Sequence, residues 1–389
     1  MKKSLLFLII MSFISLSYAQ VQQYSPKAWY KTVKEPHQIK TLDQELNYTN
    51  PINPTVTSLR AADIVVGETW YDLQSNSSMA NRITAFDDGT IATTWTRGMS
   101  ASSYPDRGTG YNYFDGSAWG EYPTERIEEQ RTGWPSIAAY GENGEIVCSH
   151  TFGTDGLIFS WRENKGEEDW NYSTLVGPPG HEDISWPRMI TSGENNEIIH
   201  VICVTLGTGN SGTVYEGLDG ALLYSRSVDG GQSWDPENII LDGVSSDYTN
   251  GWGGDDYTWA QPMGSTISFT AFGGIRDGVA MKSTDNGDNW ERIVFFESPV
   301  PFFENGDLIP QFGGGDGYNA AVIDDEDIVH VSFGRQIHHD DDGAGPYYYI
   351  YSDGLVYWNE TMPALDSAML QADILPSDWT TMNLYQNGN

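Results

Sequence analysis

The sequence is poor in cysteine and in basic residues, and it has no long apolar run after its first residues. Two cysteines among 389 residues exclude a disulfide framework, and Cys148 and Cys203 lie in apolar, strand-like runs typical of buried thiols. Lysine and arginine number 20 against 54 acidic residues, a formal net charge of −34. Because this charge opposes nucleic acid and anionic membranes, we exclude both as partners. No later segment has the roughly 20 consecutive apolar residues of a transmembrane helix.

The first residues have the pattern of a secretory signal peptide. Lys2 and Lys3 precede the apolar run 5–14, and small residues stand at Ser17 and Ala19. This order of charge, apolar core and small residues predicts cleavage after Ala19. We therefore expect a protein that is secreted or held at the cell surface. We also expect it to be a monomer.

The composition after the signal peptide is typical of an all-β protein. The chain has 42 glycines, 14 tryptophans and 22 tyrosines, and no long stretch has helical periodicity. Glycine supplies the positive φ of tight turns, and aromatic residues favour strands. The composition therefore predicts many short strands joined by tight turns.

Internal repeats organise these strands. Residues 134–146 align without a gap with residues 186–198, and both segments begin with Trp-Pro. Each holds an apolar strand, a turn rich in glycine and asparagine, and a second apolar strand. Looser copies surround Ile91, Ile267 and Ile328. The spacing is that of propeller blades and gives five repeats.

Two turns carry the Asp-box pattern S-x-D-x-G-x-x-W at equivalent repeat positions. The motif residues are Ser227, Asp229, Gly231 and Trp234 in the first copy, and Ser283, Asp285, Gly287 and Trp290 in the second. The Asp carboxylate can accept backbone N–H groups inside the turn, glycine takes the positive φ, and tryptophan packs on the blade. We therefore interpret these residues as structural.

The flanking segments complete the predicted ring. Residues from about 63 to 78 and the tail after Thr361 each have strand-like patterns without a complete blade. Pairing them would form a composite sixth blade and remove exposed edges. The prediction is a six-bladed β-propeller of four-stranded antiparallel blades over 61–389, preceded by the signal peptide 1–19 and an extended leader 20–60. Seven blades are the alternative, and a sorting domain after residue 389 of a longer parent is left open.

Together these motifs resemble the sialidase and Asp-box (BNR repeat) propeller superfamily over roughly residues 63–389, including exported proteins of the Bacteroidetes. Residues 81–84 and 89–97 also look like the segment that opens the sialidase domain. That resemblance implies that Arg82 is one of three arginines that hold a substrate carboxylate. Thr84 stands where the family has proline, and no Tyr/Glu nucleophile pair is matched, so the catalytic residues are not carried over.

The order of strands in a meander predicts where a site would lie. The Asp-box turns fall at one end of each blade, and the entries to first strands and exits from second strands fall at the other, where binding loops are expected. The arginines expected at that end are Arg82, Arg97, Arg188, Arg276 and Arg335. Guanidinium groups suit carboxylate or sulfate ligands, and the alternative is ion pairing between blades.

Aromatic and acidic residues near this end give further candidates. Trp134, Trp186 and Trp259 open first strands and either stack on sugar rings or pack in the core. His338 and His339 are candidate acid/base residues. The carboxylates of Asp340, Asp341 and Asp342 either bind Ca²⁺ or form a solvated acidic loop.

We therefore expect a secreted binding protein that presents one loop-rich face to an extracellular, anionic glycan or to a protein. No cofactor is required by this hypothesis. A sialidase-like glycosidase, or another enzyme that cleaves polysaccharides such as a lyase, is the first alternative. A purely structural surface protein is the second.

Overall fold

The computed structural model describes residues 64–371, except for residues 76, 101–102, 168, 305, 344–345 and 349–353. The expected signal peptide, the leader and the tail from residue 372 lie outside the described residues. No helix within the described part is long and apolar enough to cross a membrane.

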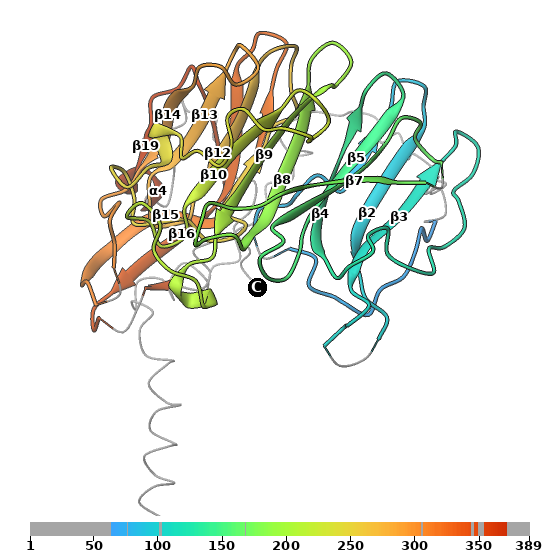
Figure 1. Cartoon of the computed structure of the whole chain (residues 1–389). Coiled ribbons are helices and arrows are strands. Elements are labelled where there is room, and N and C mark those ends of the chain that lie inside the picture. The colour runs from blue at the N-terminus through green and yellow to red at the C-terminus, as the bar shows by residue number, and fades with distance from the viewer. Residues whose placement is uncertain are drawn as a thin grey trace, which may run out of the picture. The chain divides into compact units, whose positions relative to one another are not determined.

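Antiparallel sheets follow one another along the described chain (Figure 1). The first contains β1 (Ile83–Ala85), β2 (Ile91–Arg97) and β3 (Gly108–Phe114). The second contains β4 (Gly133–Tyr140), β5 (Gly144–His150), β6 (Leu157–Arg162) and β7 (Asn171–Leu175). The third contains β8 (Ile184–Ser192), β9 (Ile198–Thr205) and β10 (Leu222–Ser227).

The fourth sheet contains β11 (Tyr257–Trp259), β12 (Ile267–Ala271), β13 (Gly278–Ser283) and β14 (Glu291–Glu297). The fifth contains β15 (Ile309–Ile323), β16 (Val329–Asp340), β17 (Tyr347–Tyr348) and β18 (Gly354–Asn359). The strand β19 (Leu365–Asp366) then pairs in parallel with β14, and the short helix α4 (Ser367–Gln371) follows. Two short 3-10 helices, Thr208–Asn210 and Asp242–Val244, lie in connecting loops. The all-β prediction is confirmed, and each sequence repeat corresponds to one sheet.

Consecutive sheets bury apolar side chains between them. One such cluster joins the first and second sheets through Ala92, Ile137 and Val147. Larger clusters join the second sheet to the third, the third to the fourth, and the fourth to the fifth. Cys148 and Cys203 are buried as free thiols, as predicted, in the cluster between the second and third sheets. Burial raises the pKa of both thiols. Sheets that are apolar on both faces require this face-to-face stacking.

The composite sixth blade does not form from the described residues alone. Residues 64–80 contain no strand among those described, and β19 pairs with the fourth sheet. The remainder of the predicted blade, from residue 372, lies outside the described residues. The sixth blade and the closure of the ring stay predictions.

A short N-terminal segment, residues 77–81, connects several sheets. The backbone N–H of Ser78 donates to the carbonyl of Asp255 before β11, at 3.0 Å, and its hydroxyl accepts the N–H of Asn319 in β15, at 3.0 Å. The carbonyl of Asn81 accepts the N–H of Ile137 in β4 at 2.9 Å. The segment therefore links the second, fourth and fifth sheets and contacts Arg188 and Asp255 through Ser78.

The two S-x-D-x-G-x-x-W turns close on their own side chains. In the first, the Asp229 carboxylate accepts the N–H groups of Gln232 and Ser233 at 3.1 and 2.9 Å. The Ser227 hydroxyl donates to Asp229 and accepts the N–H of Gly231, which has φ +78°. The carboxylate satisfies backbone donors that the turn itself leaves unpaired.

The second turn repeats this arrangement at the end of β13. The Asp285 carboxylate accepts the N–H of Asn289 at 2.9 Å, and Gly287 has φ +86°. The Trp290 indole donates to the carbonyl of Gly287 at 3.2 Å, and in the first turn Trp234 packs 4.9 Å from Phe159. Trp290 therefore closes its own turn and also packs 5.1 Å from Tyr224 of β10, and Trp234 fixes its turn to β6.

Candidate binding site

Matching backbone irregularities begin the first strands of the second and third sheets. Trp134 and Trp186 each precede proline and adopt positive φ, +52° and +51°, and a β-bulge shifts the register at both places. A bulky residue in this conformation is strained, and such strain is concentrated at functional sites. Both indoles contact the ring of His150, with centroids 5.7 and 6.2 Å away.

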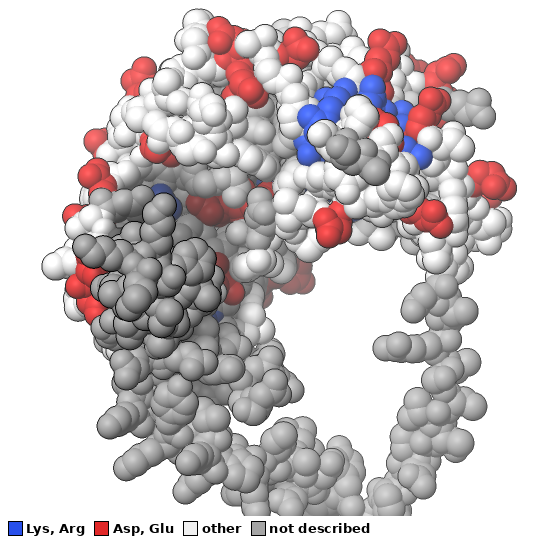
Figure 2. Space-filling view, turned by 90° about the horizontal axis from the view of Figure 1, so that it is seen from below, with Lys and Arg blue, Asp and Glu red and all other residues white. Residues whose placement is uncertain are grey.

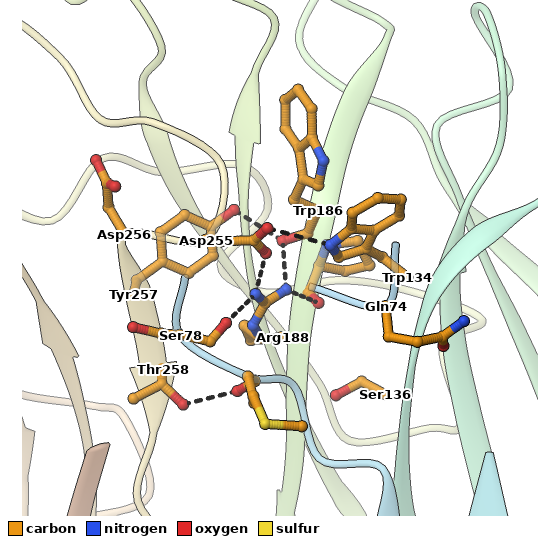
Figure 3. A network of polar contacts seen from close by, with 12 residues as sticks. Gln74, Ser78, Trp134, Ser136, Trp186, Arg188, Asp255, Asp256, Tyr257 and Thr258 are labelled. Carbon is orange, nitrogen blue, oxygen red and sulfur yellow. Dashed lines mark hydrogen bonds and ion pairs between the residues drawn. The ribbon is translucent and has the colours of Figure 1, made fainter. Parts of the chain in front are cut away.

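A buried ion pair lies between these bulges and the fourth sheet (Figure 3). The Arg188 guanidinium pairs with Asp255, and both side chains are almost fully buried. Arg188 Nη2 also donates to the carbonyl of Ser78 at 2.6 Å, and the Trp134 indole donates to Asp255 at 3.2 Å. Asp255 has φ +73°, a third strained residue in one network. The residues that hold this pair come from four separate parts of the chain.

Arg82 adds a second positive charge beside this pair. Its Nη2 donates to the carbonyl of Gln74 at 2.6 Å, whereas its Nη1 is buried without a hydrogen-bond partner among the described residues. Burial and the neighbouring Arg188 lower the pKa of Arg82 to about 9, against the opposing effect of Asp255. Arg188 and Arg82 therefore both lie near the single carboxylate of Asp255, whereas Asp256 faces Arg276.

His150, at the end of β5, lies at the centre of the positive charges. Its ring stacks on Trp134, with centroids 5.7 Å apart, and its Nδ1 accepts the backbone N–H of Trp186 at 3.1 Å. Burial and four arginines lower the pKa of His150 to about 3; these are, in order of effect, Arg107, Arg188, Arg131 and Arg82. The imidazole is therefore neutral at physiological pH, and the proton resides on Nε2 because Nδ1 accepts a hydrogen bond.

Buried Arg107 and partly exposed Arg131 extend the positive charge toward the surface. Their guanidinium carbons lie 4.2 and 4.1 Å from the ring centre of Phe152, a side chain that is 46% exposed. Arg107 Nη1 donates to the hydroxyl of Tyr71 at 3.0 Å, and Arg131 Nε donates to the carbonyl of Tyr104 at 3.0 Å. Among the described residues, neither arginine forms an ion pair. A dense patch of basic atoms is visible on the face shown in Figure 2.

The unused donors of this group converge beside Gly133. A methyl group placed on Gly133 would lie 3.2 Å from both Arg107 Nη2 and His150 Nε2. Neither atom has a hydrogen-bond partner in the described part of the chain. We call the five residues Arg82, Arg107, Arg131, Arg188 and His150 the arginine–histidine site. Two unpaired donors at equal distance from one point suit an oxygen anion.

The sequence predicted two of these four arginines, Arg82 and Arg188. Of the other predicted arginines, Arg97 donates to the carbonyl of Thr124 at 2.7 Å, and Arg276 lies 3.9 Å from Asp256, the neighbour of Asp255. Arg335 donates to a carbonyl of α4. Four residues in or beside the site were not predicted because they lie in loops: Arg107, Arg131, Tyr71 and Asp255. The repeated Trp-Pro pair indicated only the nearby starts of the first strands.

The three predicted tryptophans differ in their surroundings. Trp134 is buried against His150, and Trp186 is partly exposed. Trp259 donates its indole N–H to the carbonyl of Arg188 at 2.9 Å and packs on Phe269, 5.2 Å away. Trp259 therefore packs in the core, and Trp186 is the most accessible of the three.

The acidic loop after β16 is arranged differently. His338 Nε2 donates to the carbonyl of Gly315 at 2.7 Å, and burial lowers the pKa of His338. The Asp340 carboxylate accepts the N–H of Gly343 at 2.7 Å, and His339 lies 3.8 Å from Asp341. No group of three or more metal-binding side chains occurs among the residues described, which exclude residues 344–345 of this loop. Calcium binding by Asp340, Asp341 and Asp342 stays an untested prediction.

Comparisons with known proteins give distant structural similarity. No family model matches the chain, and no curated protein matches it. An ulvan lyase, solved with bound -[GlcA(1-4)Rha3S]-, is 10% identical with a TM-score of 0.44, over 80% of this chain and 76% of its own. The six-bladed β-propeller lectin of Aleuria aurantia is 11% identical with a TM-score of 0.43, over 81% and 83%.

The sialidase of Trypanosoma rangeli, solved with the inhibitor DANA, is 12% identical with a TM-score of 0.38, over 71% of this chain and 48% of its own. At these values the similarity assigns neither a family nor an activity to the chain. Its function must be argued from its own residues.

Proposed function

We propose that this chain is a secreted, six-bladed Asp-box propeller that binds an anionic extracellular glycan at the arginine–histidine site. The observation that carries the proposal is the excess of positive charge in a chain of net charge −34. Four arginines lower the pKa of His150, and one of them, Arg188, is paired with a carboxylate among the described residues. A compensating anion would relieve the cost of placing guanidiniums close together.

The chemistry of the site favours an anionic sugar. Arg107 Nη2 and the Nε2–H of neutral His150 can donate to one carboxylate or sulfate above Gly133. The exposed ring of Phe152 and the partly exposed ring of Trp186 give apolar surfaces for the faces of sugar rings. A neutral glycan would leave the guanidiniums uncompensated, so we expect it to bind weakly.

A glycan array followed by titration calorimetry tests this function. Carboxylated or sulfated glycans should be retained and neutral ones not, and added salt should weaken binding. Arg107→Gln and Arg131→Gln should each weaken binding of the best ligand by at least about tenfold. Arg292→Gln is the matched control, because Arg292 also lies over an aromatic ring, Tyr248, but pairs with Asp277. Unchanged affinity in both site variants would contradict the proposal.

Cleavage of the bound glycan is the second candidate, and one contact favours it. The hydroxyl of Tyr71 accepts a hydrogen bond from Arg107 at 3.0 Å, which fixes a potential proton donor or nucleophile beside the guanidinium. His150, with a pKa of about 3, is a poor proton acceptor at neutral pH. Mass spectrometry of the ligand after incubation separates binding from cleavage, and Tyr71→Phe should abolish cleavage without abolishing binding. A protein ligand and a purely structural role remain the alternatives to both.

A further inference from the structure

A cavity of about 350 Å³ lies at the outer strand β7 of the second sheet. Its wall includes Glu129, Gln130, Asp155, Tyr172 and Val176. In sequence, Gln130 directly precedes Arg131, and Asp155 follows Phe152 by three positions. The cavity and the arginine–histidine site therefore share two loops. Its volume is at the lower end of the range of small-molecule sites.

The wall of this cavity combines hydrogen-bond acceptors with an aromatic ring. Glu129 and Asp155 are exposed carboxylates that form no ion pair in the described part of the chain. Tyr172 is 42% exposed, and its hydroxyl donates to the carbonyl of Ile127 at 2.7 Å, which holds the ring in place. Carboxylates accept hydrogen bonds from sugar hydroxyls, and an aromatic face packs against the C–H groups of a pyranose.

The two neighbouring sites therefore have opposite charge. Arg107 and Arg131 attract an anion, whereas Glu129 and Asp155 repel one and suit an uncharged ring. A glycan charged on every sugar would place an anion against the carboxylates of the cavity.

We propose that the glycan ligand alternates an acidic sugar with a neutral one. The acidic sugar binds at Arg107 and Arg131, and the adjoining neutral sugar occupies the cavity at Glu129, Asp155 and Tyr172. This inference rests on the proposed function and specifies its substrate class: a linear polysaccharide with one carboxylate or sulfate in every second residue.

Two commercial oligosaccharides of equal length test the inference by calorimetry. Hyaluronan carries a carboxylate on every second sugar, and oligogalacturonate carries one on every sugar. The parent protein should bind the hyaluronan oligosaccharide about tenfold more tightly than oligogalacturonate. Only oligogalacturonate places a carboxylate against the carboxylates of the cavity. The double variant Glu129→Gln with Asp155→Asn should bind oligogalacturonate more tightly and reduce this preference to about threefold or less.

A matched control changes net charge by the same amount elsewhere. Asp325→Asn with Glu326→Gln lies in the exposed turn between β15 and β16 and should leave the preference unchanged. Melting temperatures establish that all variants are folded.

The outcomes separate this inference from the proposed function. An unchanged preference in the Glu129/Asp155 variant, or a best array ligand that is charged on every sugar, would overturn the inference while the proposed function stands. If the parent protein binds no anionic glycan, or if neither Arg107→Gln nor Arg131→Gln weakens binding, the proposed function itself fails.

Discussion

The two ends of the sheets use charged side chains in opposite ways. At the ends of β10 and β13, Asp229 and Asp285 direct their carboxylates into their own turns, where backbone and side-chain donors of the turn bind them. At the other end, Arg107 and Arg131 bond to neutral oxygens and lie over Phe152, and each keeps an unused donor. The first arrangement leaves nothing to offer a ligand, and the second does. Binding is therefore expected at the arginine–histidine site and not at the turns.

The largest effect should come from the buried pair at the base of that site. Asp255→Ala leaves Arg188 and Arg82 without their nearest carboxylate in a fully buried network. Removing one partner of a buried ion pair costs about 3–5 kcal/mol, so the free energy of unfolding should fall by that amount. Chemical denaturation measures it.

The exposed pair Arg226–Asp288 provides the control, since its aspartate is 63% exposed. Asp288→Ala should cost about 1 kcal/mol or less. Equal losses from the two substitutions would show that the network at Asp255 does not stabilise the fold.

A smaller loss is expected at the turns. Asp229→Ala or Asp285→Ala leaves backbone donors without an acceptor and should cost about 1–3 kcal/mol of unfolding free energy. Because these carboxylates are remote from the arginine–histidine site, glycan affinity of the folded fraction should not change. Lost affinity at an unchanged melting temperature would contradict a purely structural role.

The turn at Asp285 also predicts a pH dependence. Hydrogen bonds from Asn289 and Ser283 lower the pKa of Asp285 from 3.8 to about 2. A depressed carboxyl pKa stabilises the protein above about pH 4, and this stabilisation is lost as pH falls toward 2. Melting temperatures of the parent should therefore decrease more steeply over that interval than those of Asp285→Ala. Parallel curves would contradict the assignment.

Local sequence patterns predicted much of the fold for a physical reason. Strands and turns are specified by residues that are neighbours in sequence, as in the alignment of residues 134–146 with 186–198 and in the Asp-box segments. Pairing within each sheet is also local, since the strands of each repeat follow one another. The sixth blade depends on pairing between distant ends, and β19 in fact pairs with β14.

The site was predicted only in part, because its residues meet through loops and bulges. Arg107 reaches His150 from a loop before β3, and Asp255 reaches Arg188 from a loop before β11. No local pattern specifies such contacts. The Trp-Pro pair at 134 and 186 marked the position of the bulges but not their positive φ.

Two buried histidines allow the arginine–histidine site to be compared with the core. The pKa values of His150 and His200 are both lowered to about 3, His150 by burial and four arginines, His200 by burial and Arg226. An anion bound at the arginine–histidine site should offset the arginines and raise the pKa of His150, and leave that of His200 unchanged. NMR titration of the imidazole protons with and without glycan measures this. Equal shifts in both, or none in either, would contradict ligand binding beside His150.

Both histidines should also make stability depend on pH in the absence of ligand. A histidine whose pKa is lowered in the folded state favours unfolding as pH falls from about 6.5 toward 3, because the unfolded chain binds the proton first. His150→Asn should make that decrease less steep. A slope equal to that of the parent would contradict a neutral, buried His150.

The smallest structural change should affect binding alone. Gly133→Ala places a methyl group 3.2 Å from Arg107 Nη2 and His150 Nε2, where the anion is expected. Binding should weaken by about tenfold or more, with a shift in melting temperature of only a few degrees. Gly209→Ala is the control, since nothing lies within 4 Å of its added methyl group. Unchanged affinity in Gly133→Ala would show that the anion does not bind at this point.

The most direct measurement is a crystal structure of the protein with the best anionic oligosaccharide from the array. We expect a carboxylate or sulfate oxygen within hydrogen-bond distance of Arg107 Nη2 or His150 Nε2, above Gly133, with Arg131 and Phe152 beside the same sugar. A ligand bound at another face, with the guanidiniums of Arg107 and Arg131 free of any anion, would contradict it.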